Sequence, residues 1–145
     1  MQKTIYGLLR IFMGFIFLWA FFDKTFGLGF ATKFENAWIR GGSPTTGFLK
    51  FGVHGPMTNF FHSLAGLPAI DWLFMLGLLF VSLTLILNRF VKWGVLAGCI
   101  MLAFMYLALM FPENNPVIDD HIIYILVLIL IGLNVDNQKQ TSPRY

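Results

Sequence analysis

Asp119, Asp120 and His121 are the residues whose types and spacing most clearly suggest chemistry in this chain. Carboxylates beside an imidazole can take up, hold and release protons, and the ordinary histidine pKa of about 6.5 suits that work. Asp23, followed by Lys24, supplies a further acid. We therefore take Asp23, Asp120 and His121 as the candidate catalytic residues. The competing interpretation is structural, because acids in the first turn of a helix also complement its dipole.

Other side chains could hold a ligand beside these groups. The candidates are Arg10, Lys24, Arg40, Asp119, Tyr106 and Tyr124. The two tyrosines could extend a polar site near the acids and the histidine, while Lys33, Arg40 and Lys50 could attract an oxyanion. Each of these side chains could equally serve as a solvated charge or a packing residue.

Arg10 stands out because it interrupts an apolar stretch. Gly7 and Gly14 share its stripe at helical spacing, and small residues mark contact faces between membrane helices. We therefore predict that Arg10 faces neighbouring helices, with Asn88 and Asn134 within reach. The alternative is an anchor whose side chain extends to the lipid headgroups.

Metal, disulfide and nucleic-acid chemistry lack sequence signals. His54 and His62 are eight residues apart, which is no recognised ligand spacing, and Cys99 is the single cysteine. The chain has no phosphate-binding loop, and no basic block suggests nucleic acid. We expect no metal site and no cofactor held by the chain itself.

Composition identifies the class of protein that must position these residues. Of the 145 residues, 57% are hydrophobic and only 12% are charged, whereas soluble domains are about 25% charged. A helix needs about 20 apolar residues to cross a bilayer, and the chain contains several such stretches. The sequence therefore predicts an all-α membrane protein with one domain over residues 1–145.

Four transmembrane helices are expected, at about residues 4–22, 70–87, 93–111 and 116–135, followed by a tail at 136–145. The last span needs an argument, because only 14 uncharged residues run from Ile122 to Val135. Asn115 as N-cap and Pro116 at the first helical position would lengthen the helix enough. Asp119, Asp120 and His121 would then enter the membrane interface.

The loop at 25–69 is too long to be structureless in so small a protein. Phe30, Phe34 and Trp38 recur at four-residue spacing and predict one or two amphipathic helical turns, and a second short helix is predicted from Pro56 onward. Both should lie at the membrane surface. They would form either a simple cap over the bundle or a lid over a ligand.

Basic residues give the orientation. The side with both termini carries Lys3, Arg89, Lys92, Lys139 and Arg144, against four basic residues on the other side. Both termini are thus predicted to be cytoplasmic. Asp23, Asp119 or Asp120, and His121 would share the outer side and meet under the loop as the polar end of a pocket.

The order of several short motifs resembles the DoxX/DoxD family over about Ile5 to Leu133. The motifs are Leu9-Arg10-Ile11-x-x-Gly14-x-x-Phe17-Leu18 with Asp23-Lys24, Gly47-Phe48-Leu49 with Gly55-Pro56, and Asn115-Pro116-x-x-Asp119-x-His121. The resemblance implies a four-helix subunit like the small subunit of thiosulfate:quinone oxidoreductase, in a bacterial or archaeal cytoplasmic membrane. It supplies no catalytic residues.

By this resemblance, quinone is the expected substrate and a second redox subunit the expected partner. The alternative is a non-catalytic membrane anchor or assembly partner for another protein. Gly94 and Gly98 form a small-residue pair in the third span, which serves close packing within the bundle or in a homo-oligomer. A small-molecule transporter is a third interpretation, but four spans leave little room for a transport pathway without oligomerisation.

Overall fold

The computed structural model describes residues 2–111 and 117–140, and these residues are almost entirely helical. The helices are α1 (Gln2–Phe26), α2 (Thr58–Leu64), α3 (Pro68–Ile86), α4 (Val91–Ala108) and α5 (Asp120–Gln140). No β-strand occurs in these two ranges; a single bridge joins His54 to Leu109.

Three of the helices are long and apolar enough to cross a membrane. These are Lys3–Phe26 within α1, the whole of α3 and the whole of α4. The apolar part of α5, Asp120–Val135, is shorter than a full span. The chain thus has the helical, apolar character of a membrane protein, with three helices of spanning length.

Some predicted boundaries were wrong. The first helix continues past residue 22 to Phe26, so Asp23 and Lys24 belong to it. The helix predicted to end at 111 ends at Ala108, because the chain turns there to pair with the loop: His54 N donates to Ala108 O at 3.1 Å. The predicted tail is helical up to Gln140.

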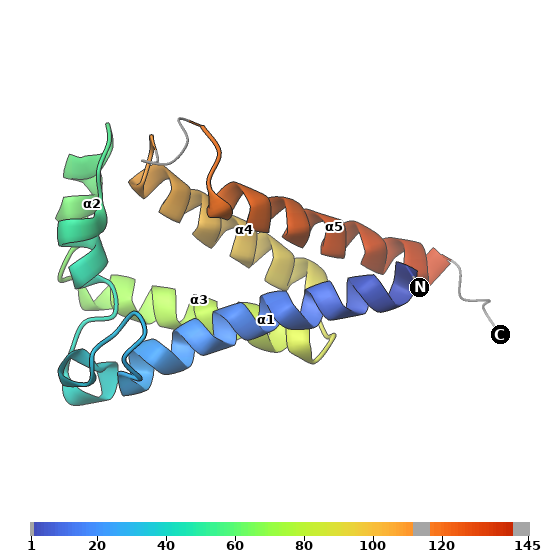
Figure 1. The fold of residues 1–145 in the computed structure, drawn as a ribbon, viewed down its shortest axis with the longest axis horizontal. Coiled ribbons are helices and arrows are strands. Elements are labelled where there is room, and N and C mark those ends of the chain that lie inside the picture. Colours follow the sequence, from blue (N-terminus) through green and yellow to red (C-terminus); the bar gives the residue numbers. More distant parts are fainter. Residues whose placement is uncertain (1, 112–116, 141–145) are drawn as a thin grey trace.

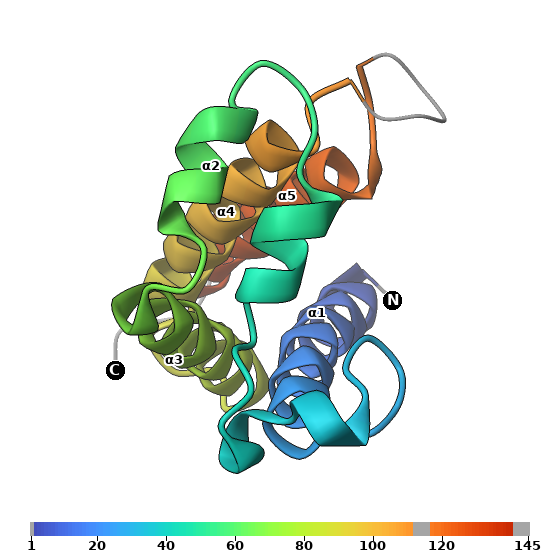
Figure 2. The ribbon, with the colours of Figure 1, turned by 90° about the vertical axis from the view of Figure 1, so that its left-hand side faces the viewer.

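The four long helices form a bundle in which successive members run in opposite directions (Figure 1). Each packs against two others: α1 against α3 and α5, and α4 against α3 and α5. Residues 27–67 gather at one end, with the end of α1 and the starts of α3 and α5 (Figures 1 and 2). We call this the loop end.

The bundle core is apolar and so is much of the outer surface. Met75, Val81, Leu85 and Leu128 are fully buried at the centre. Large apolar side chains such as Leu73, at 71% exposure, point away from the bundle. A surface of this kind fits lipid rather than water.

Glycines allow the helices to approach closely. Gly14 of α1 packs against Leu85 and Ile86, Gly94 packs against Thr84, and Gly98 lies against Leu128, Val81 and Phe17. Both glycines of the Gly94/Gly98 pair are buried within the chain. They therefore serve packing inside the bundle, and a homo-oligomer would need another surface.

The loop contains four short helical segments. They are η1 (Phe34–Asn36), η2 (Trp38–Arg40), the π-turn η3 (Phe48–Gly52) and α2. The helix predicted from Pro56 is confirmed as α2, whose Phe61 packs with Leu49, Val53 and Ala108 in a second small core. The helical turns predicted around Phe30–Trp38 are present as two 3-10 turns, which begin at Phe34 rather than at Phe30, and Ala37 (φ −58°, ψ 140°) separates them.

Candidate functional site

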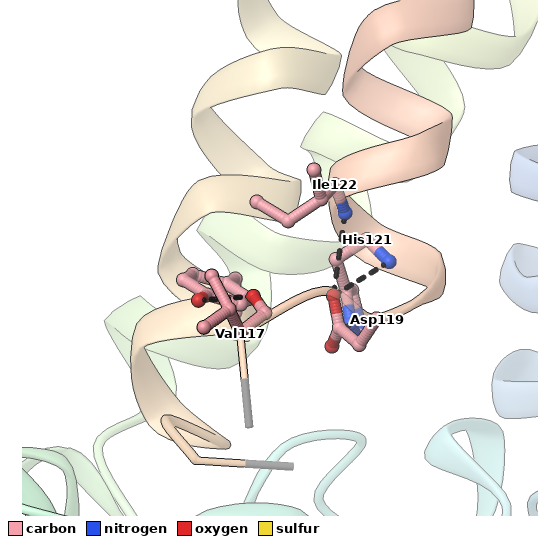
Figure 3. Close-up of polar contacts among 5 residues, drawn as sticks. Val117, Asp119, His121 and Ile122 are labelled. Atoms are coloured by element: carbon pink, nitrogen blue, oxygen red, sulfur yellow. Dashed lines mark hydrogen bonds and ion pairs between the residues drawn. The ribbon is translucent and has the colours of Figure 1, made fainter. Parts of the chain in front are cut away.

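Asp119 and His121 form a hydrogen-bonded pair at the start of α5 (Figure 3). His121 Nδ1 lies 2.7 Å from Asp119 Oδ2, and the two side chains are only 17% and 14% exposed, respectively. An ionised carboxylate only accepts hydrogen bonds, so the shared proton is assigned to Nδ1. The neutral ring then has Nε2 as its acceptor, and no hydrogen bond to Nε2 exists among the described residues.

Asp119 is also the N-cap of α5. Its Oδ1 accepts from His121 N at 3.1 Å and from Ile122 N at 3.3 Å, which is the bonding of an N-cap residue. The negative charge favours the positive end of the helix dipole. One carboxylate therefore caps α5 and orients the imidazole.

The predicted start of this helix at Pro116 was wrong. Residues 117–119 are not helical and α5 begins at Asp120. Asp119 supplies a charged cap to the free amides, so the helix need not extend further back. Asn115 and Pro116 lie outside the described residues.

The two tyrosine candidates lie near the pair in different ways. Tyr106 of α4 donates its hydroxyl to Val117 O at 2.7 Å (Figure 3), which ties the segment before α5 to α4. Tyr124 is half-buried against the bundle core. Asp120 is exposed, and no hydrogen bond of its side chain occurs among the described residues.

Asp23 has a different set of partners. It is only 2% exposed, and its two oxygens accept from Phe30 N at 3.1 Å and Ala31 N at 3.0 Å. The chain turns back directly after α1, with Gly27 in the left-handed region at φ 66°. This return brings the two amides onto the carboxylate. Asp23 therefore holds the first turn of the loop.

The basic candidates at the loop end contact aromatic rings. Lys24 Nζ lies 5.7 Å from the centre of the Phe74 ring, and the Arg40 guanidinium lies 3.7 Å from the Phe34 ring. Both are cation–π distances. Neither base forms an ion pair within 4.0 Å of a described carboxylate.

The polar candidates are therefore not joined into one cluster by hydrogen bonds. Asp119 and His121 are brought together as expected, whereas Asp23 bonds to the loop backbone and Arg40 stacks on Phe34. Across the described ranges, no hydrogen bond links Asp23 with Asp119, Asp120 or His121. The Asp119–His121 pair is therefore the candidate site for proton chemistry.

Arg10 lies at the opposite end of the bundle from the loop. Its Nη1 donates to the carbonyls of Leu85 and Ile86, the latter at 3.2 Å. These carbonyls lie in the last turn of α3, where the regular helical pairing ends; Leu85 O also accepts from Asn88 N at 3.4 Å. Arg10 faces a neighbouring helix, as predicted, and it bonds to the α3 backbone rather than to Asn88 or Asn134.

Asp71 is the polar residue whose role the sequence did not reveal. It is buried in the first turn of α3, and Oδ1 accepts from Ser43 Oγ at 2.8 Å, Thr45 Oγ1 at 2.5 Å and Thr45 N at 3.2 Å. The available signal was an acid at the start of an apolar helix, together with hydroxyls in the Gly-rich loop. Which hydroxyls would reach it could not be read from spacing.

Potential metal ligands do not gather in the part of the chain that the structure describes, where no three His, Cys, Asp or Glu side chains form a group. Cys99 is half-buried, with its sulfur 4.0 Å from Ile125 O. Comparison of the chain with models of protein families, with curated proteins and with solved structures gave no match.

Proposed function

We propose that this chain is a four-span membrane subunit that binds a quinone, or a similar ring with exchangeable protons, beside Asp119 and His121. The hydrogen-bonded Asp119–His121 pair carries the proposal. The proposed role is that expected from the DoxX/DoxD resemblance: a small subunit of a sulfur-compound:quinone oxidoreductase, with the electron donor on a partner subunit.

The four-span topology is supported by the surroundings of α5. Its full length of 21 residues corresponds to about 31 Å of helix. It lies alongside α4 and α1, both of spanning length, and Leu128 and Ile131 belong to the same core as Met13 and Val81. This packing supports the proposal that α5 crosses the membrane as a fourth span.

The chemistry follows from the two nitrogens of His121. Asp119 holds Nδ1, so Nε2 can accept a proton from a quinol hydroxyl or, once protonated, donate one to a quinone oxygen. The pair opens an apolar helix, so a lipid-soluble ring can approach it without entering water.

Quinone binding can be measured directly on the purified protein in lipid nanodiscs. We expect decylubiquinone to quench tryptophan fluorescence saturably, with binding weakened about tenfold in His121→Gln, a loss typical of one hydrogen bond to a charged group. Asp119→Asn keeps an N-cap acceptor but removes the charge, so it should weaken binding without unfolding α5.

Asp120→Asn is the matched control, because Asp120 is an exposed acid in the same turn. Its binding should equal that of the parent. Equal binding by the parent, His121→Gln and Asp119→Asn would reject the site. A parent that binds no quinone would reject the proposed function.

Topology can be tested by thiol labelling in a Cys99→Ala background. Four spans with cytoplasmic termini predict that Ser43→Cys is labelled from outside intact cells and Ser142→Cys is not. If α5 did not cross, both positions would lie on the same side and both would be labelled. Labelling of Ser142→Cys alone would reverse the orientation.

A non-catalytic anchor or assembly partner is the second candidate. The supporting observation is that Asp23 and Asp71 both bond to the loop, which fixes it as a cap, while Phe51 on that cap is 88% exposed. Such a cap suits a protein surface. Failure of quinone to bind, with topology and folding intact, would favour this role.

A further inference from the structure

Arg40 has an aromatic neighbour but no hydrogen-bond acceptor among residues 2–111 and 117–140. Its guanidinium carbon lies 3.7 Å from the centre of the Phe34 ring, and both side chains are exposed. Among the side chains and backbone groups described, none accepts a hydrogen bond from it. Stacking covers one face of the guanidinium plane and leaves the N–H groups at its edge free.

Two tryptophans indicate the depth at which Arg40 lies. Trp38 belongs to the same 3-10 turn as Arg40 and meets Trp72 edge to face, with ring centres 4.7 Å apart. Trp72 is the fifth residue of α3, about 6 Å along the helix from Pro68. Tryptophan is enriched at the headgroup level of membranes, so the turn that carries Arg40 is expected at that level.

The surface around Arg40 combines apolar and basic groups. Phe34 and Ile39 are 57% and 63% exposed. Across residues 27–67, Lys33, Arg40 and Lys50 are opposed by one acid, Glu35, giving a formal excess of 3 − 1 = 2 positive charges. A soluble oxyanion would use the charge but leave the apolar side chains in water, whereas a lipid satisfies both.

We propose that Arg40, stacked on Phe34, binds the phosphate of a lipid headgroup in the leaflet that contacts the loop. The edge of the guanidinium presents two parallel N–H donors, which match two phosphate oxygens. Phe34 holds the guanidinium plane in place and extends the apolar surface toward the acyl chains. This site is separate from the Asp119–His121 pair and does not depend on quinone binding.

Native mass spectrometry of the full-length protein, released from mixed micelles, tests the site. The probes are phosphatidylglycerol and a phosphate-free monoglucosyldiacylglycerol with the same acyl chains. The parent should retain phosphatidylglycerol preferentially. Arg40→Gln should weaken that retention about tenfold, as expected for a charged hydrogen-bonding group, with no change in melting temperature in detergent.

Three comparisons sharpen the result. Lys50→Gln removes another exposed base from the same loop and should alter retention by no more than about twofold, because exposed charges are screened. Arg40→Lys keeps the charge but loses the paired donors, and Phe34→Leu keeps an apolar side chain but loses the ring. Both should give intermediate retention.

Several outcomes would overturn the proposal. Equal retention by Arg40→Gln and the parent would exclude Arg40. An equal loss in Lys50→Gln would indicate diffuse charge rather than a built site. Equal retention of the glycolipid by the parent would exclude phosphate recognition. Displacement of phosphatidylglycerol by inorganic phosphate would assign the site to a soluble oxyanion instead.

Discussion

Asp71 and Asp119 occupy similar positions in the sequence, each at the start of a long apolar helix, but their surroundings differ. Oδ1 of Asp71 accepts three hydrogen bonds from Ser43 and Thr45. Asp119 caps α5 and pairs with His121, whose side chain is 17% exposed. Asp71 therefore binds two hydroxyls and an amide, whereas Asp119 binds an imidazole as well as amides.

The acids at the loop end therefore fall into two kinds: those that hold the loop in place and one that pairs with an imidazole. A buried carboxylate with several hydroxyl and amide donors fixes a segment in one place, because removing it leaves those donors unsatisfied. A carboxylate paired with an imidazole can share and pass a proton. Asp23, with two amide donors, belongs with Asp71. Substitutions at Asp71 and Asp23 should therefore mainly lower stability. Substitutions at Asp119 should mainly weaken ligand binding.

Asp71→Ala should cause the largest loss of stability. Thr45 N and Thr45 Oγ1 lose their acceptor, and Ser43 Oγ keeps only Thr46 Oγ1 as a partner. The free energy of unfolding should fall by about 3 kcal/mol. Thermal unfolding in detergent measures the loss. Asp71→Asn retains one acceptor oxygen and should lose less. A melting temperature for Asp71→Ala equal to that of the parent would show that the loop does not depend on this carboxylate.

Asp23→Ala should follow, with a loss of about 2 kcal/mol for two unsatisfied amides in the loop. The effect should be local. Hydrogen exchange should accelerate at Phe30 and Ala31, while the amides of α5 keep their protection. Uniform acceleration over the whole chain would mean that Asp23 supports the bundle rather than the loop.

Arg10→Leu should lower the free energy of unfolding by about 1.5 kcal/mol, near the upper range for polar contacts between membrane helices. The reason is the loss of the bonds to the α3 carbonyls of Leu85 and Ile86. Arg10→Lys should restore part of the loss, since one ammonium can still donate. Unchanged stability in Arg10→Leu would make Arg10 an anchor to the headgroups.

Asp119→Ala should lower stability by about 1 kcal/mol, the typical value for a helix N-cap. Asp119→Asn should restore the cap and hence the melting temperature, but not quinone binding. Comparing Asp119→Ala with Asp119→Asn therefore separates the effect of losing the N-cap from the effect of losing the charge. Equal binding by Asp119→Asn and the parent would leave Asp119 with the capping role alone.

His121→Gln should have the smallest effect on stability, within about 0.5 kcal/mol, because its side chain supports no other element. Its effect on quinone binding should nevertheless be the largest of the five. Circular dichroism melts and fluorescence titrations on the same preparation compare the two quantities. A large loss of stability with unchanged binding would place His121 with Asp71 and Asp23.

The sequence determined the elements that depend on local composition. Long apolar stretches predicted α1, α3 and α4, because the free energy of transfer from water to lipid depends mainly on residue type and length of the stretch. The amphipathic run after Pro56 likewise predicted α2. The proximity of Asp119 and His121 could also be predicted from the sequence, since two residues this close at the start of a helix lie within hydrogen-bonding reach of each other.

Tertiary structure decided the partners of the charged groups. Asp23 is 7 and 8 residues from Phe30 and Ala31, and it meets their amides because the chain turns back after α1. Asp71 bonds to Ser43 and Thr45, which are 28 and 26 residues away, and only the packed loop brings them together. The same holds for Arg10 and Leu85 of α3, which are 75 residues apart. Hydrogen bonds are short and directional, so the partners of long-range hydrogen bonds depend on how the helices and the loop pack. That packing cannot be read from the spacing of residues along the chain.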